Sequence, residues 1–129
     1  MKTKFLTLMF LIIGTLVFSQ KVSIKKDVIY LGEKECLKIT SSDPNNVSIS
    51  DLEGNEIIFL KFIHNSRYGS VYNKVTFLEQ NLTFTSQSYV FNKKLLINKL
   101  VESKVLNNCK LDSDKVKTFV LKYDENIER

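Results

Sequence analysis

One stretch of the chain gathers most of the side chains that could bind a ligand. His64, Arg67, Tyr68 and Tyr72 fall within nine residues of one another. Arg forms forked hydrogen bonds to anions, and aromatic rings present faces to cations and sugars. These four residues are therefore the candidate binding site for an anionic or sugar-like ligand. The alternative is a polar connection between two strands, since turn residues are commonly polar.

Catalytic and metal-binding patterns are scarce. The chain has one His and no Trp, and it contains no HExxH, GxSxG, P-loop or GxGxxG motif. Zinc needs three or four ligands within reach, whereas this chain offers His64 and two distant Cys. We therefore predict no catalytic residues, no metal site and no cofactor. A small hydrolase that uses His64 is the alternative.

The first nineteen residues are typical of a secretory signal peptide. Lys2 and Lys4 precede an uncharged apolar run over residues 5–18, and Ser19 stands where the cleavage site requires a small residue. The run is shorter than the ~20 residues that cross a bilayer as a helix. We therefore expect export, cleavage before Gln20 and no stable membrane span afterwards. The mature chain, residues 20–129, is predicted to be soluble and either periplasmic or extracellular.

The net charge and its distribution along the chain limit the classes of partner that the protein is expected to bind. The formal net charge is +5, and removal of Lys2 and Lys4 lowers it to +3. The remaining basic residues are scattered in sequence, whereas nucleic-acid binding needs a clustered basic face. We therefore expect no nucleic-acid partner. An envelope protein, a glycan or a small ligand is expected instead.

Two cysteines, Cys36 and Cys109, are the only ones in the chain. An even number in an exported protein favours a disulfide. Strand alternation argues against the bridge, because Leu37 and Ile39 would face the core while Cys36 and Lys38 share the other face. The sequence leaves both possibilities open.

The elements expected to position these residues form an α+β domain. Short β-branched and aromatic runs over residues 21–87 predict an antiparallel meander of six or seven strands. The run 57–60 does not alternate, so it is predicted to be central and covered on both faces. Helical spacing predicts helices over about 91–106 and 113–123, packed on one face of the sheet. Residues 107–108 should end the first helix, and the charged tail 124–129 is expected to fray.

The ending Val17-Phe18-Ser19-Gln20 resembles signal peptides of flavobacteria and their relatives in the Bacteroidota. The hairpin 49–58 and the helical pattern over 94–123 resemble small exported proteins of unknown function from those bacteria. This resemblance implies the fold and the compartment, and it transfers no functional residue. We therefore expect a non-enzymatic envelope binding module. The alternative is an inhibitor or immunity-type protein that acts on a secreted hydrolase.

Overall fold

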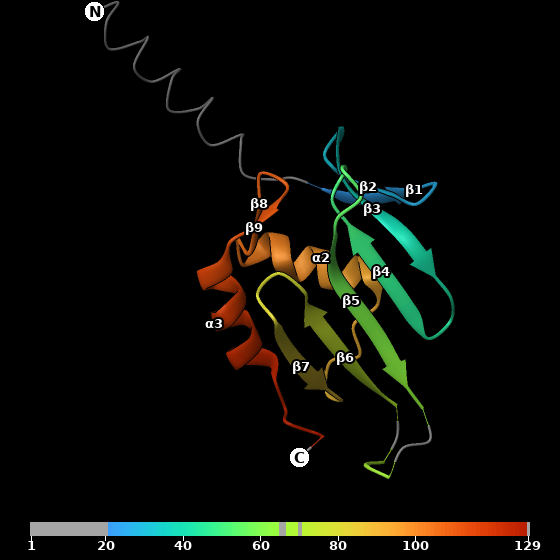
Figure 1. Cartoon of the computed structure of the whole chain (residues 1–129), viewed down its shortest axis with the longest axis vertical. Helices are drawn as coiled ribbons and strands as arrows, with labels where there is room; N and C mark the ends of the chain where they lie inside the picture. The colour runs from blue at the N-terminus through green and yellow to red at the C-terminus, as the bar shows by residue number, and fades with distance from the viewer. Residues whose placement is uncertain (1–20, 65–66, 70, 129) are drawn as a thin grey trace, which may run out of the picture.

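The computed structural model describes residues 21–64, 67–69 and 71–128, so the predicted signal peptide lies outside the described residues. Seven strands form one sheet in which each strand pairs antiparallel with the next along the chain (Figure 1). The strands are β1 (Val22–Lys25), β2 (Val28–Leu31), β3 (Lys34–Ser42), β4 (Asn46–Ser50), β5 (Glu56–Ile63), β6 (Tyr72–Phe77) and β7 (Leu82–Ser86). The predicted α+β meander is confirmed.

Tight turns make this meander possible. Lys26 and Asp27 have φ of 50° and 64°, which gives the two-residue turn that matches the twist of paired strands. In the β4–β5 turn, Gly54 has a φ of 94°, and the Asp51 carboxylate accepts hydrogen bonds from the backbone N–H groups of Glu53 and Asn55. The Asp51 side chain therefore organises this turn, as Asp does in Asx turns.

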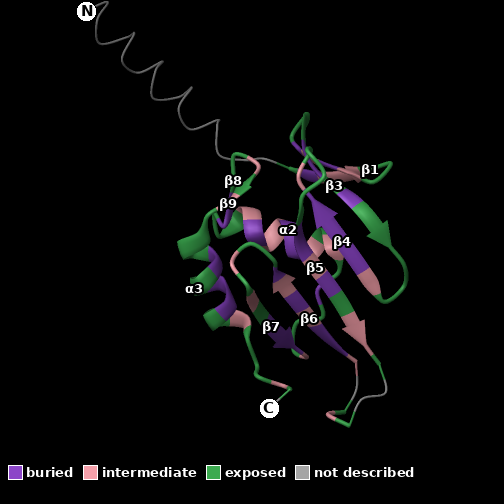
Figure 2. Ribbon diagram, viewed as in Figure 1, coloured by how far each residue is buried: buried purple, intermediate pink, exposed green. Residues whose placement is uncertain are grey.

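Two helices follow the sheet, α2 (Lys93–Glu102) and α3 (Ser113–Tyr123). Asn92 and Asp112 cap their N-termini by accepting backbone N–H groups of the first turn. The apolar stripes of both helices join the inner face of the sheet in one core (Figure 2). The helical members are Leu96, Ile97, Leu100, Val116, Phe119 and Val120, and the predicted sheet members are Leu37, Ile39, Ile58, Leu60 and Phe77. The predicted one-sided packing and the bounds of the second helix are confirmed.

The first helix differs from the prediction of 91–106. It ends at Glu102, and Lys104 then adopts a φ of 61° that turns the chain away. The following residues form a hairpin of β8 (Leu106–Asn107) and β9 (Lys110–Leu111), with Asn108 and Cys109 in the left-handed region. Val105 and Leu106 are buried in the core although they lie outside the helix, so tertiary packing overrides the helical pattern here.

Three β-bulges interrupt the strand alternation, at Cys36, Thr40 and Ile57, and two of them place a side chain in the core. Leu37 pairs with Ile29 and Glu35 with Tyr30, so Cys36 has no direct partner in β2. Likewise Ile57 has no direct partner in β4. A bulge places an extra residue on the side of its neighbour. The alternation argument that turned Cys36 away from the core is therefore wrong. Ile57 is buried because of its bulge, while Phe59 on the other face is only half-buried.

The C-terminal tail is bound to the sheet, so the prediction that it frays is wrong over Asp124–Glu128. The Glu125 N–H donates to the Thr85 carbonyl at 2.8 Å, and the Thr85 N–H donates to Asp124 Oδ1 at 3.1 Å. β7 is an edge strand, and an edge strand exposes backbone groups that need partners. The tail supplies those partners.

Candidate functional site

The predicted binding residues lie at the β5–β6 connection, the lower end of the sheet in Figure 1. His64 follows the last residue of β5 and is exposed. Arg67 is also exposed, and its Nη2 donates to the Tyr68 hydroxyl at 2.8 Å. The guanidinium carbon lies 5.0 Å from the Tyr68 ring centroid. The loop therefore presents a cation and an aromatic ring that already contact each other.

Beneath this pair lies Tyr72, which is only 2% exposed. The rings of Tyr68 and Tyr72 meet edge to face, with centroids 6.2 Å apart. The Tyr72 hydroxyl donates to Glu128 Oε2 at 2.6 Å, and Lys74 Nζ donates to Glu128 Oε1 at 2.8 Å. Tyr72 therefore supports the loop and does not present its ring to solvent. The structure brings three of the four predicted residues into one chain of contacts.

Burial of the phenol, followed by its hydrogen bond to Glu128, raises the pKa of Tyr72 to about 12. The hydrogen bond from Lys74, and then that from Tyr72, lowers the pKa of Glu128 below its ordinary 4.5. Tyr72 thus stays protonated and Glu128 stays ionised at neutral pH. Their fixed protonation states keep the donor and the acceptor matched.

Sequence reasoning missed Lys74 and Glu128. The sequence could have indicated that Lys74 lies near Tyr72, because residues 72 and 74 of one strand face the same side. No sequence pattern could have placed Glu128 near Tyr72, since 56 residues separate the two along the chain. Figure 1 shows that α3 lies beside β7, so the tail that follows α3 begins close to the sheet.

A second carboxylate holds the tail one strand further along. Partial burial would raise the pKa of Glu125, but hydrogen bonds from the backbone N–H groups of Gln87 and Ser88 and from the Ser86 hydroxyl outweigh it and lower the pKa. Glu125 Oε1 accepts the Gln87 N–H at 3.0 Å. Glu125 and Glu128 therefore secure the tail as carboxylates.

We predict that acid releases this tail. The folded-state pKa values of both Glu125 and Glu128 lie below the ordinary 4.5, so their contribution is present above pH 4.5 and is lost as the pH falls through the depressed values. Hydrogen exchange of the Glu125 and Ile127 amides, corrected for intrinsic rates, should accelerate below that pH. At neutral pH, Glu125→Gln should remove about 1 kcal/mol of local protection, roughly a fivefold faster exchange.

The control for this prediction is Glu33→Gln, which removes an exposed carboxylate from the β2–β3 turn. It should leave exchange of the tail amides unchanged. Equal protection of both tail amides at pH 7 and pH 3 would contradict the prediction.

At the opposite end of the sheet, Cys36 of β3 forms a disulfide with Cys109 of the β8–β9 hairpin. Their Cα atoms lie 5.1 Å apart, within the range that a disulfide spans. Cys36 is 1% exposed, and Cys109 is half-buried. The bulge at Cys36 brings the two sulfur atoms together. The possible bridge from the sequence is present, and it is typical of an oxidising compartment.

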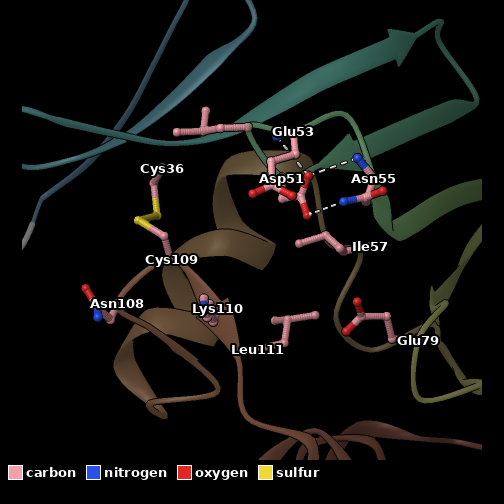
Figure 3. A pocket seen from close by; sticks show the side chains of 11 residues that line it. Cys36, Asp51, Glu53, Asn55, Ile57, Glu79, Asn108, Cys109, Lys110 and Leu111 are labelled. Atoms are coloured by element: carbon pink, nitrogen blue, oxygen red, sulfur yellow. Dashed lines mark hydrogen bonds between the residues drawn. A yellow bond between two sulfur atoms is a disulfide. The ribbon is translucent and has the colours of Figure 1, made fainter.

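Next to the disulfide is a cavity of about 510 Å³ that sequence reasoning did not find (Figure 3). It lies among the β4–β5 turn, the β6–β7 turn and the β8–β9 hairpin. Its polar lining is Asp51, Glu53, Asn55, Glu79, Asn108 and Lys110, and its apolar lining is Leu52, Ile57, Leu111 and the disulfide. These residues come from strands and turns that are distant in sequence, so no local motif marks the cavity.

Two further findings concern the described part of the chain. No three His, Cys, Asp or Glu residues there come close enough to hold a metal ion. None of its helices combines the length and the apolar content needed to span a bilayer.

Comparison of the chain with protein-family models, with curated proteins and with solved structures found no match.

Proposed function

We propose that this protein is an exported, non-enzymatic binding module of the cell envelope that recognises a partner protein, a glycan or a small ligand through the β5–β6 loop. The observation that supports this proposal is the contact between the exposed Arg67 and the half-buried Tyr68, which rests on the buried Tyr72. Arg and Tyr are among the residues that contribute most to binding at protein interfaces. The expectation of export rests on the signal peptide pattern, and the disulfide is in keeping with it.

Preorganisation strengthens the argument for this loop. Binding normally costs about 0.5–1.5 kcal/mol for each flexible side chain that it immobilises. Here the Arg67–Tyr68 hydrogen bond restrains both side chains before any partner arrives. Glu128 in turn holds Tyr72, so the support is tied to the sheet and to the tail. Less conformational freedom is therefore left to lose on binding.

The alternative is an inhibitor or immunity-type protein. A restrained Arg and Tyr at the end of a sheet could enter the active-site cleft of a secreted hydrolase. An assay of the recovered partner separates the two functions, because only the inhibitor lowers the partner's hydrolytic rate.

We predict that Arg67→Ala/Tyr68→Ala weakens binding without unfolding the domain. Losing an interface anchor costs about 2 kcal/mol or more, which is roughly a thirtyfold weaker affinity. Arg67 is exposed and Tyr68, although half-buried, lies outside the core cluster, so these substitutions should change stability by only about 0.5 kcal/mol. The mature domain should be used to capture partners from the envelope fraction of its own host. Affinities of the parent and the variant are then measured by calorimetry or surface plasmon resonance.

The matched control is Lys117→Ala/Leu121→Ala, which removes a cation and a large apolar side chain from the exposed face of α3. This variant should bind like the parent. Equal retention of the partner by the parent and by the Arg67/Tyr68 variant would show that the loop is only a connection.

A further inference from the structure

The cavity beside the disulfide lies at the end of the sheet opposite to the β5–β6 loop, so it is a separate site. We propose that it binds a ligand that carries a primary ammonium or guanidinium group on an aliphatic stem. Such a group occurs in free diamines and in the basic side chains of peptides. The proposal goes beyond the loop function and does not depend on it.

The apolar part of the cavity suits the stem. Ile57, which is 6% exposed, and the Cys36–Cys109 bridge form its inner wall. Cys36 and Ile57 each stand at a β-bulge, and these bulges direct the two side chains toward the same space. Leu111 and Leu52 extend the apolar lining outward. Small-molecule sites commonly have volumes of ~300–1,000 Å³, and the volume of this cavity falls in that range.

The charged part suits the cationic head. Figure 3 shows Asp51 and Glu53 on one side of the space and Glu79 across from them. Among the described residues that line the cavity, Lys110 is the one cation, so the lining holds three carboxylates and one ammonium group. Neither of the ion pairs between described residues involves these groups. The lining therefore carries an excess of negative charge that no ion pair within the described part of the chain neutralises.

Asp51 has a structural role in the β4–β5 turn. Its oxygens accept the Glu53 and Asn55 N–H groups and the Asn55 side-chain amide at 2.9–3.0 Å, which holds the β4–β5 turn in shape. Glu53 and Glu79 are exposed and make no such hydrogen bonds to described residues. We therefore assign recognition of the cation to Glu53 and Glu79, with Asp51 as a positioning residue.

The walls are held in place before a ligand arrives. The disulfide ties the β8–β9 hairpin to β3, and Asp51 fixes the opposite rim. Gln80 Nε2 donates to Ser113 Oγ at 3.2 Å, which links the Glu79 turn to the start of α3. A site whose walls are fixed loses little conformational entropy on binding.

The test is a ¹⁵N–¹H NMR titration of the oxidised mature domain at low salt. The probes are the peptide acetyl-Gly-Lys-Gly-amide, its uncharged analogue with norleucine in place of Lys, and 1,5-diaminopentane. We expect the Lys peptide to shift the amides of residues 51–57 and 108–111, and the norleucine peptide to shift them far less. Comparable binding of the diamine assigns the site to free amines, whereas binding of the Lys peptide alone assigns it to a basic peptide side chain.

Three variants sharpen the result. Glu53→Gln/Glu79→Gln should weaken binding about three- to tenfold, as expected for two partly exposed charge pairs. Lys110→Gln should strengthen binding about two- to threefold, because it removes the competing cation. Asp27→Asn/Glu33→Gln removes the same charge as the first variant from the exposed β1–β2 and β2–β3 turns and should change nothing.

The proposal is overturned if neither cationic probe shifts the cavity amides. Equal affinity for the Lys and norleucine peptides would also overturn it, as would equal weakening by the control variant. All substituted residues are exposed, and the reference spectrum of each variant reports whether it is folded. Failure here leaves the loop function standing, because no variant touches Arg67 or Tyr68.

Discussion

Loss of the Cys36–Cys109 disulfide is expected to lower the free energy of unfolding by about 4 kcal/mol. The bridge joins residues 73 positions apart, so it removes a large loop-closure entropy from the unfolded chain. A domain of this size has only ~5–15 kcal/mol of stability. Urea unfolding of the oxidised and the reduced parent measures the difference directly.

The Cys36→Ala/Cys109→Ala variant provides an independent measurement for this prediction. Its midpoint should agree with that of the reduced parent, because neither form has the cross-link. Coincident unfolding curves for the oxidised and reduced parent would contradict the prediction. They would mean that the entropy which the bridge removes from the unfolded chain is offset elsewhere and gives no net stabilisation.

Phe119→Ala is expected to destabilise the domain by about 3–5 kcal/mol, as large-to-small changes in a core do. Phe119 is 3% exposed and lies in the middle of the α3 stripe. Its ring centroid lies 4.6 Å from that of Tyr123, 5.7 Å from that of Phe84 and 6.2 Å from that of Phe77. The substitution therefore leaves a cavity between α3 and strands β6 and β7 and also removes favourable ring contacts.

The same helix provides the control. Leu121 is 82% exposed, so Leu121→Ala should change the free energy of unfolding by less than about 0.5 kcal/mol. Urea unfolding of both variants beside the parent separates core packing from helix propensity, because each replaces a larger residue with Ala in α3. An unfolding curve for Phe119→Ala that overlays the parent would show that α3 does not anchor the core.

The β5–β6 loop shows which features of the candidate site could be predicted from residue types alone. The sequence placed Arg67, Tyr68 and Tyr72 together because they are neighbours along the chain. It could not separate the exposed Arg67 and the half-buried Tyr68 from the buried Tyr72, whose hydroxyl is bound by Glu128 of the C-terminal tail. The disulfide is similar: the cysteine count suggested it, and the bulge at Cys36 made it possible.

Sequence by itself determined the features that depend on local preference. Short β-branched and aromatic runs predicted an antiparallel meander of six or seven strands, of which the sheet has seven, and helical spacing predicted the second helix over 113–123. The tertiary structure alone decided the bulges at Cys36 and Ile57, the β8–β9 hairpin, the attachment of the tail to the sheet, and the cavity beside the disulfide. Each of these depends on groups far apart in sequence that satisfy one another's hydrogen bonds or share one core. A local sequence pattern does not identify the distant residue that a given residue will contact. Tertiary contacts also override weak local propensity wherever the two differ.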